Sequence, residues 1–433
     1  MTTDLLVIGA GWSGLLAAYT AAKAGLQVQV VAKGLGSMHW AAGTVDVMGY
    51  TSEEMSRPVQ QPLEAIQGLA ATHPDHPYAL LGAEQVQTAL DTFKSLAAEL
   101  GLPYSGAATA GDNLLLPSAV GALRPTYLAP QAQLAGDASR PEPQLIVGFH
   151  GLRDFYPELI AENLAKQGFT ARAAFLPLSV LTEQSDRNNV HLAEGLDDKG
   201  RRAKLGSELK RLARPGERIG LPAILGLDDH AAAFADLQTA AGVPLFEIPT
   251  LPPSVPGMRL FKALRARLWS MGVRLDAGME AIGASTTPAV NGTAGRVQWV
   301  ETATTSRPLK NRAKNYLLAT GGILGGGFDS DHTGRLWETV FDLPLTIPQK
   351  RYEWFRPEFM NPAGHPVFNG GVAVNVKMQP CAVDAAGKVV YANLWAAGGA
   401  LASVDPIQQH SLEGIAIASG MAAAQAIVRV MAQ

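Results

Sequence analysis

Residues 5–14 read Leu-Leu-Val-Ile-Gly-Ala-Gly-Trp-Ser-Gly. This apolar run, followed by glycines at positions 9, 11 and 14, predicts a buried strand that turns directly into a helix. Helical apolar spacing over residues 13–24, then Gly25 and a second apolar run at 28–31, continues the pattern as strand, helix, strand. A crossover of this length joins parallel strands that are covered on both faces. The sequence therefore predicts an α/β fold with a Rossmann-like parallel sheet.

Two later apolar runs, at residues 316–322 and 394–399, also end in glycine turns. We expect both to join the first sheet. The sequence between the first of the apolar runs and these later ones differs in composition, with polar, proline-bearing and Gly/Ala/Pro-rich stretches. We therefore expect residues 1–75 and 310–433 to form one discontinuous cofactor-binding domain. Residues 76–309 should form an inserted, more irregular connecting and substrate or cap region.

The composition excludes several classes of protein. A net charge of -3, from 35 basic and 38 acidic residues, gives neither the basic footprint of a nucleic-acid-binding protein nor a polybasic tail for an anionic membrane. The single Cys381 cannot form an internal disulfide, and no signal-peptide pattern is present at the N-terminus, so a cytoplasmic location is expected. The apolar stretch 414–431 is interrupted by Gln425 and Arg429 and is expected to be a buried helix, with any membrane contact made through another subunit.

Two further segments have a distinctive composition. Residues 197–218 are strongly basic, which is typical of a solvated helix face or, alternatively, of a docking surface for an acidic partner. Residues 247–257 carry four prolines, which predicts a rigid extended loop, and helical apolar spacing follows over residues 258–271.

The glycine loop at residues 9–14 predicts a phosphate site. Gly9 permits the tight bend, Gly11 lets the backbone approach a phosphate, and Gly14 lets the helix pack close to the strand. Free N–H groups in the first helical turn, where Ser13 stands, and the positive end of the helix dipole attract an anion. The loop therefore predicts nucleotide binding.

Lys33 stands where such folds usually carry an acid that binds the ribose of adenosine. Because that carboxylate is missing, the loop is expected to hold the phosphate of a mononucleotide such as FMN, with FAD as the alternative. Lys33 itself either pairs with a phosphate as a point charge or faces solvent.

The segment 34–43 resembles the flavin-contacting loop of the succinate dehydrogenase and fumarate reductase flavoproteins. The resemblance places Ser37, His39, Ala42 and Gly43 near a flavin, and a non-covalent contact of His39 is expected rather than a covalent bond. The same resemblance to flavoproteins with two dinucleotide-binding motifs implies further contacts from the residues Thr320, Gly321, Gly322, Gly370, Gly371, Gly398 and Gly399. Gly414 and Ile415 begin a helix whose N-terminus would stabilise negative charge on the reduced flavin.

Over nearly its whole length, the chain resembles the B subunits of the anaerobic glycerol-3-phosphate dehydrogenase family. The stretches that carry this resemblance are residues 4–14, 37–46, 147–155, 221–227, 247–260 and 393–399. The resemblance implies an FMN-dependent subunit that works with a catalytic flavoprotein A subunit and an iron-sulfur C subunit at the cytoplasmic face of the membrane. Glycerol 3-phosphate would become dihydroxyacetone phosphate, and electrons would pass to quinone.

Oxidation of a secondary alcohol needs a base for the hydroxyl proton and cations for the substrate phosphate. His365 and His410 are candidate bases, and the arginines tested as anion clamps would be Arg259, Arg153, Arg124 and Arg335. No metal site is expected. Two alternatives remain open from the sequence: a non-catalytic flavin relay or scaffold subunit, and a stand-alone fumarate-reductase-like oxidoreductase acting on another small anion.

Overall fold

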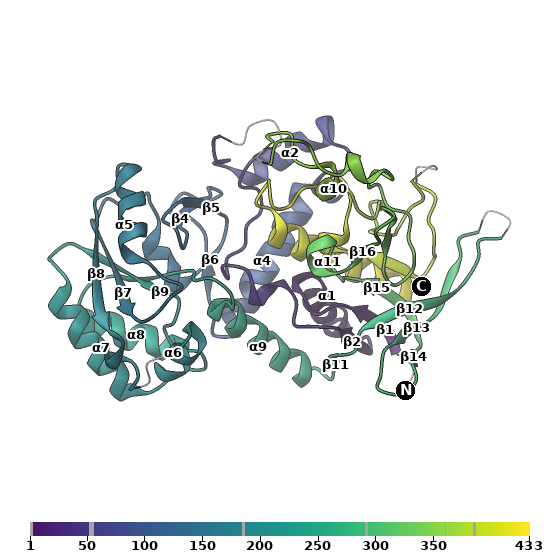
Figure 1. The fold of residues 1–433 in the computed structure, drawn as a ribbon. Coiled ribbons are helices and arrows are strands. Elements are labelled where there is room, and N and C mark those ends of the chain that lie inside the picture. The colour runs from purple at the N-terminus through teal and green to yellow at the C-terminus, as the bar shows by residue number, and fades with distance from the viewer. Residues whose placement is uncertain (1–2, 52–55, 184–186, 291–292, 360, 384–386) are drawn as a thin grey trace. The chain divides into compact units, whose positions relative to one another are not determined.

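The structure is a computed structural model that describes residues 3–51, 56–183, 187–290, 293–359, 361–383 and 387–433. The contacts between residues group the chain into two compact units, drawn in Figure 1. The first unit comprises residues 1–37, 46–93 and 264–433, and the second comprises residues 38–45 and 94–263. The expected domain limits at residues 75 and 310 stay a prediction.

A five-stranded parallel sheet organises the first unit. Its strand order is β11-β2-β1-β15-β18, with β11 at Arg274–Ala277, β2 at Val28–Ala32, β1 at Thr3–Ile8, β15 at Ala313–Leu318 and β18 at Leu394–Ala396. In the register, Val7 lies between Val30 and Leu317, and all three side chains are fully buried or nearly so. Burial on both faces explains why β1, β2, β15 and β18 carry apolar runs, whereas the edge strand β11 is polar and not buried. The predicted α/β class and the strands at 5–8, 28–31, 316–318 and 394–396 are confirmed.

Two helices of the first unit, α1 (Trp12–Lys23) and α11 (Leu412–Met431), pack against each other. A Cβ atom on Gly420 would lie 2.5 Å from the Ser13 carbonyl oxygen, so only glycine permits this separation. Among the described residues, α11 is the one helix long and apolar enough to cross a membrane, and 67% of its most apolar window is buried in the protein. This burial supports the expected core helix.

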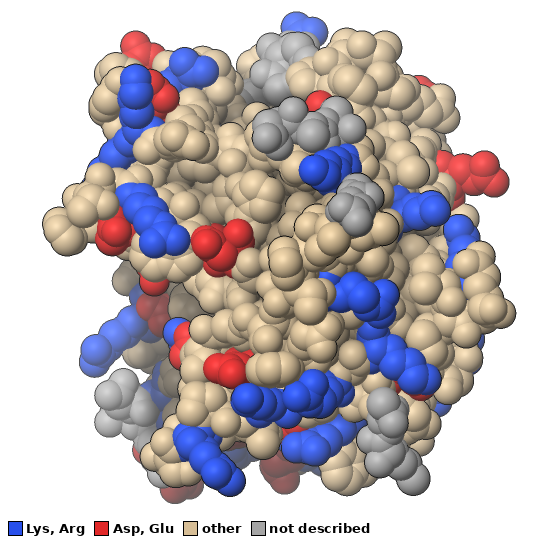
Figure 2. Space-filling view, turned by 90° about the vertical axis from the view of Figure 1, so that its right-hand side faces the viewer, with Lys and Arg blue, Asp and Glu red and all other residues tan. Residues whose placement is uncertain are grey.

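The rest of the first unit consists of shorter elements. Its other regular elements are α2 (Pro62–Thr72), α3 (Pro77–Leu81), α10 (Pro366–Asn369), β12 (Ala281–Thr287), β13 (Arg296–Thr302), β14 (Leu309–Asn311), β16 (Phe328–Ser330) and β17 (Leu336–Glu338). The antiparallel sheet β12-β13-β14 carries Lys310, and Arg312 follows it; their charged groups lie 4.4 and 4.5 Å from the centroid of the Trp299 ring. Figure 2 shows lysines and arginines scattered among acidic residues on one face of the protein.

The second unit contains its own four-stranded parallel sheet, with strand order β10-β9-β7-β8. These strands are β7 (Gln144–His150), β8 (Ala171–Pro177), β9 (Arg218–Pro222) and β10 (Leu245–Ile248). From β7 the chain proceeds to β8 on one side through α5 (Pro157–Lys166), and later to β9 on the other side through α6 (Asn189–Gly195) and α7 (Lys199–Leu212). Because crossovers between parallel strands are right-handed as a rule, connections in opposite directions place helices on both faces of the sheet. The inserted part is therefore itself doubly wound and more regular than its sequence indicated.

The remaining elements complete the second unit. These are α8 (His230–Ala241), β3 (Tyr104–Ser105), β4 (Leu114–Pro117), β5 (Leu123–Thr126) and β6 (Ala129–Pro130), while α4 (Ala83–Glu99) and α9 (Val255–Ser270) contribute residues to both units. The prediction of a loop over residues 247–257 was wrong at both ends of this range. Strand β10 continues to Ile248, and α9 begins at Val255 because Pro256 is tolerated in the first helical turn, where its missing N–H has no helical partner.

Candidate functional site

The carboxyl edge of the first sheet is lined by glycines from three strands. Gly9 follows β1 with a φ of +121°, and a Cβ on it would overlap the carbonyl oxygen of Ala319, which follows β15. A Cβ on Gly322 would overlap the carbonyl oxygen of Gly399, which follows β18. The ends of three neighbouring strands therefore approach one another as bare backbone, which side chains would prevent.

The turn from β1 into α1 has the geometry of an anion site. Gly11 is the N-cap of α1, no side chain caps the helix, and its first turn holds no acidic residue. A Cβ on Gly11 would meet no atom within 4 Å, so this backbone faces open space, whereas a Cβ on Gly14 would overlap the carbonyl oxygen of Gly9. Uncapped N–H groups at the positive end of a helix, facing open space, fit a phosphate group.

Two further loops lie against this turn. A Cβ on Gly36, in the loop after β2, would lie 2.6 Å from the Cα of Gly11. A Cβ on Gly398, which has a φ of +74°, would lie 2.5 Å from the Ser13 hydroxyl oxygen. Gly398 also donates its N–H to the Ser419 hydroxyl at 2.9 Å, which ties the end of β18 to α11.

The predicted ring-contacting glycines lie beside the same edge. Val372 donates its N–H to the Ala400 carbonyl at 2.8 Å, and a Cβ on Gly371 would lie 2.7 Å from that carbonyl oxygen. The structure thus brings Gly370 and Gly371 next to the segment that contains Gly398 and Gly399. Thr320 and Gly321 (φ +75°) form the neighbouring turn after β15.

At Lys33, the structure shows an ion pair that the sequence did not predict. The Lys33 Nζ lies 2.7 Å from Oε1 of Glu280, and both side chains are exposed. The hydrogen bond with Glu280 and its negative charge raise the pKa of Lys33. Met279 donates its N–H to the Ala32 carbonyl at 2.9 Å, which fixes Glu280 beside the carboxyl end of β2. A carboxylate therefore lies at this edge of the sheet, but it comes from the segment that follows the neighbouring strand β11.

Two backbone amides in the first turn of α11, those of Gly414 and Ile415, were expected to face the flavin. Gly414 donates its N–H to the Asp46 carbonyl at 3.0 Å, and Ile415 donates its N–H to the Ser411 carbonyl at 3.0 Å. Both amides therefore have protein acceptors, and a contact of either with flavin stays a prediction.

The two candidate bases, His365 and His410, differ in the contacts that their rings make. His365 accepts the Arg356 N–H on Nδ1 at 3.0 Å, and its Nε2 lies 2.9 Å from the Phe359 carbonyl oxygen, so both ring nitrogens are engaged with backbone. His410 has a φ of +48°, an uncommon conformation for a residue with a side chain, and lies just before α11. Its ring stands edge-on to Tyr50 at 5.2 Å between centroids.

The loop at residues 38–45 belongs to the second unit and is held by its backbone. The carbonyls of His39, Ala42 and Gly43 accept hydrogen bonds from the Ser254 N–H (2.7 Å), the Gln133 side-chain amide (3.0 Å) and the Tyr104 hydroxyl (2.6 Å). Ser37, which precedes this loop, is exposed in the first unit. The flavin contacts expected of these residues stay predictions.

The candidate anion clamps are mostly engaged elsewhere. Arg259 is buried and bonds Glu247 through two nitrogens, at 2.7 and 2.8 Å, while its Nε donates to the Gly226 carbonyl. Arg124 donates to the Thr44 hydroxyl, and Arg335 lies 3.6 Å from Asp342. Arg153 is exposed in the loop after β7. Burial alone would raise the pKa of Glu247, but the Arg259 charge and hydrogen bonds lower it below its usual value. These contacts favour a structural role for Arg259.

Comparison with known proteins identifies the family of the chain. Residues 4–415 match the family described as "FAD binding domain". A Halobacterium salinarum protein, named as the probable B subunit of an anaerobic glycerol-3-phosphate dehydrogenase, is 33% identical over 98% of this chain and 97% of its own length. The B subunit of the same enzyme from Yersinia pseudotuberculosis is 30% identical over 100% and 99%. The 3-ketosteroid delta1-dehydrogenase of Sterolibacterium denitrificans is 12% identical with a TM-score of 0.47, covering 99% of this chain and 100% of that one.

Proposed function

This chain belongs to the FAD binding domain family and, within it, to the family of anaerobic glycerol-3-phosphate dehydrogenase B subunits, and on that premise we propose a specific activity. We propose that it takes part in oxidising sn-glycerol 3-phosphate to dihydroxyacetone phosphate. Its partners would be a flavoprotein A subunit and an iron-sulfur C subunit, which pass electrons to quinone at the cytoplasmic side of the membrane. The full-length similarity to proteins named as B subunits carries this proposal.

We further propose that the bound flavin is FAD. The expectation of FMN rested on the lysine at position 33, where a ribose-binding acid was absent. Glu280 returns a carboxylate to that place, 2.7 Å from Lys33, and the family match supports FAD. In this arrangement the N-terminus of α1 holds the phosphates, and Glu280 accepts hydrogen bonds from the ribose hydroxyls.

A bound flavin would supply the hydride acceptor for oxidation of the alcohol carbon. The chain's own residues would bind and orient it through the glycine turns after β1, β15 and β18. His365 is poorly suited to accept the hydroxyl proton, because both of its ring nitrogens already hold backbone groups.

A flavin relay subunit without substrate chemistry is the second candidate. It is favoured by the engagement of His365 with backbone and of Arg259 with Glu247, which leaves fewer groups for catalysis. Mixing the purified flavin-loaded chain with glycerol 3-phosphate under anaerobic conditions separates the two functions. Bleaching of the flavin by the chain alone is expected for the catalyst. Bleaching that requires the A subunit would support the relay, and a stable flavin in both mixtures would contradict both functions.

A further inference from the structure

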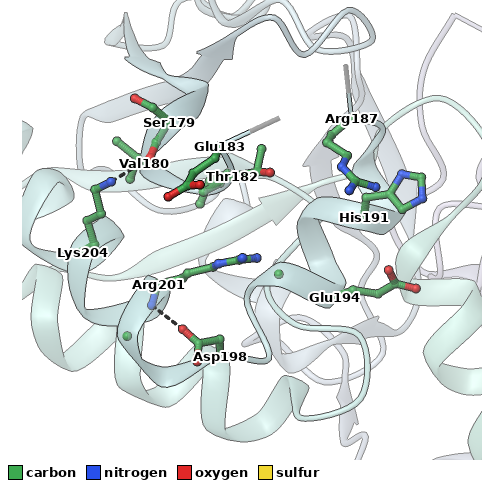
Figure 3. Close-up of a pocket in the computed structure, with 13 residues that line it drawn as sticks. Ser179, Val180, Thr182, Glu183, Arg187, His191, Glu194, Asp198, Arg201 and Lys204 are labelled. Atoms are coloured by element: carbon green, nitrogen blue, oxygen red, sulfur yellow. Dashed lines mark hydrogen bonds between the residues drawn. The ribbon is translucent and has the colours of Figure 1, made fainter. Parts of the chain in front are cut away.

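The second unit has a cavity of about 570 Å³ that the proposed function does not use (Figure 3). Its walls come from the segment after β8, from α6 and from the start of α7. The residues that line it are Ser179, Val180, Leu181, Thr182, Glu183, Arg187, His191, Glu194, Gly195, Asp198, Gly200, Arg201 and Lys204. All belong to residues 94–263, so the second unit alone forms the cavity.

The cavity lies at the carboxyl edge of the second parallel sheet. Pro177 ends β8 opposite His150 of β7, and residues 179–183 line the cavity directly afterwards. In open parallel sheets, ligands bind outside the carboxyl ends of the strands, because the loops and helix N-termini gather there. The volume is that of a small-molecule site.

Two arginines in this cavity are available to a ligand. Within the part of the chain that the structure describes, neither Arg187 nor Arg201 makes an ion pair or side-chain hydrogen bond. Figure 3 shows the Arg201 side chain extending across the cavity, with Arg187 and His191 side by side on the wall facing it. The next residue of α7 is a contrast: Arg202 is buried and bonds Asp229 and Asp236 at 2.8 and 3.0 Å.

The other charged groups are partly committed. Oδ1 of Asp198 accepts the backbone N–H of Arg201 at 2.9 Å and so caps α7, and Lys204 donates to the Ser179 carbonyl at 2.7 Å. The second contact fixes the loop after β8 as one wall. Glu183 and Glu194 remain as acceptors at the sides of the cavity. The cavity thus offers guanidinium groups for an oxyanion and carboxylates for hydroxyl groups.

We propose that this cavity binds a small phosphate ester, with Arg187 and Arg201 holding the phosphate and Glu183 and Glu194 facing hydroxyl groups. A phosphate ester carries more negative charge than a carboxylate and presents three terminal oxygens, so it suits two guanidinium forks at once. None of the residues that line this cavity belongs to the glycine turns of the first unit, so the proposal uses a different set of side chains from the proposed oxidation.

Titration calorimetry on the flavin-loaded protein tests this site, with inorganic phosphate, glycerol 3-phosphate and glycerol as separate ligands. Saturable binding of both phosphates, but not of glycerol, is expected. Arg201→Ala and Arg187→Ala should each weaken phosphate binding by about tenfold or more, the usual loss for a hydrogen bond to a charged group. Arg201→Lys, which keeps the charge but loses the fork, should bind phosphate with an affinity between those of the parent protein and Arg201→Ala.

Arg211→Ala is the matched control, because Arg211 lies on the same helix, is exposed and pairs with Glu208. It should bind phosphate like the parent protein. The inference is overturned if the parent protein shows no saturable phosphate binding, or if both alanine variants bind phosphate as tightly as Arg211→Ala. Flavin content, measured on the same samples, reports the proposed function separately, so loss of one does not imply loss of the other.

Discussion

Lys33 and Glu280 are far apart in the sequence but form an ion pair in the structure. The position after β2 carries a lysine, which indicated that no ribose-binding acid was present. Glu280 lies 247 residues later in the chain, yet its carboxylate is 2.7 Å from Lys33 because β11 pairs with β2. No local pattern could reveal this, since the pairing of β11 with β2 is a long-range contact.

Glu280→Gln should therefore weaken FAD binding by about tenfold, since a charge-assisted hydrogen bond to ribose would be replaced by a weaker one. Affinity for FMN, which has no adenosine ribose, should not change. Fluorescence titration of the apoprotein with each flavin measures both. Glu353→Gln, at another exposed and ion-paired carboxylate of the first unit, is the control. Equal FAD affinity in Glu280→Gln and the control would refute the ribose assignment.

Gly11 allows a test in which folding and cofactor binding are separable. Its φ of -81° suits any residue, and a Cβ there meets nothing within 4 Å. Gly11→Val should therefore fold, yet bind flavin about tenfold or more weakly, because the side chain fills the space proposed for the phosphates. Gly68→Ala adds a Cβ in equally open space on α2 and should keep its flavin. Normal flavin content in Gly11→Val would remove the loop's assigned role.

The Arg259–Glu247 pair predicts a loss of stability. Removing one partner leaves a buried charge unpaired, so Arg259→Met should lower the free energy of unfolding by about 3–5 kcal/mol. Replacing both partners, as in Glu247→Leu with Arg259→Met, should recover a large part of that loss. Arg265→Met, at an exposed position of the same helix, should change stability by less than about 0.5 kcal/mol. Urea unfolding measures all three, and a fully stable Arg259→Met would show that the pair contributes little.

At the scale of elements, the positions of the charged side chains in the basic segment at residues 197–218 were only partly predictable from the sequence. Residues 197–218 become α7 and the start of β9, and their charges have three different fates. Arg202 and Arg218 are buried and bonded to carboxylates or carbonyls, Arg201 and Lys204 line the cavity, and Arg211 faces solvent. Helical periodicity places residues on a face, but the identity of the neighbouring element decides whether that face is core, cavity or surface.

His76, the N-cap residue of the short helix α3, should make the stability of the protein depend on pH. Its Nδ1 accepts the Tyr78 N–H at 3.1 Å, its Nε2 contacts Gln409, and burial lowers its pKa to about 4. Below the unfolded-state pKa of about 6.5, the unfolded chain binds a proton that the folded protein refuses, so stability falls as the pH decreases toward 4.

His76→Asn keeps an N-cap acceptor but cannot take up the proton. Between pH 7 and pH 5, the parent protein should therefore lose about 2 kcal/mol more unfolding free energy than this variant. Urea unfolding at the two pH values provides the comparison. Parallel pH dependence in the two proteins would mean that His76 titrates in the folded state as it does in the unfolded chain.

At the scale of the whole molecule, the sequence indicated the first sheet because local features define it. Each of its strands predicted from the sequence, β1, β2, β15 and β18, is an apolar run beside a helix or glycine turn. Strand β11, with the polar sequence Arg-Leu-Asp-Ala, lacked that signal. The second sheet was missed because no glycine fingerprint marks its turns, and the pairing of β7 with both β8 and β9 is non-local.

The glycine edge of the first sheet is proposed to hold a dinucleotide flavin, and every functional proposal for the first unit depends on it. Mass spectrometry of the flavin released by heat from the purified chain tests this directly. We expect FAD at about one molecule per chain, because the glycine turns after β1, β15 and β18 together form one proposed flavin site. Release of FMN alone, or of no flavin from a correctly folded chain, would contradict the proposal.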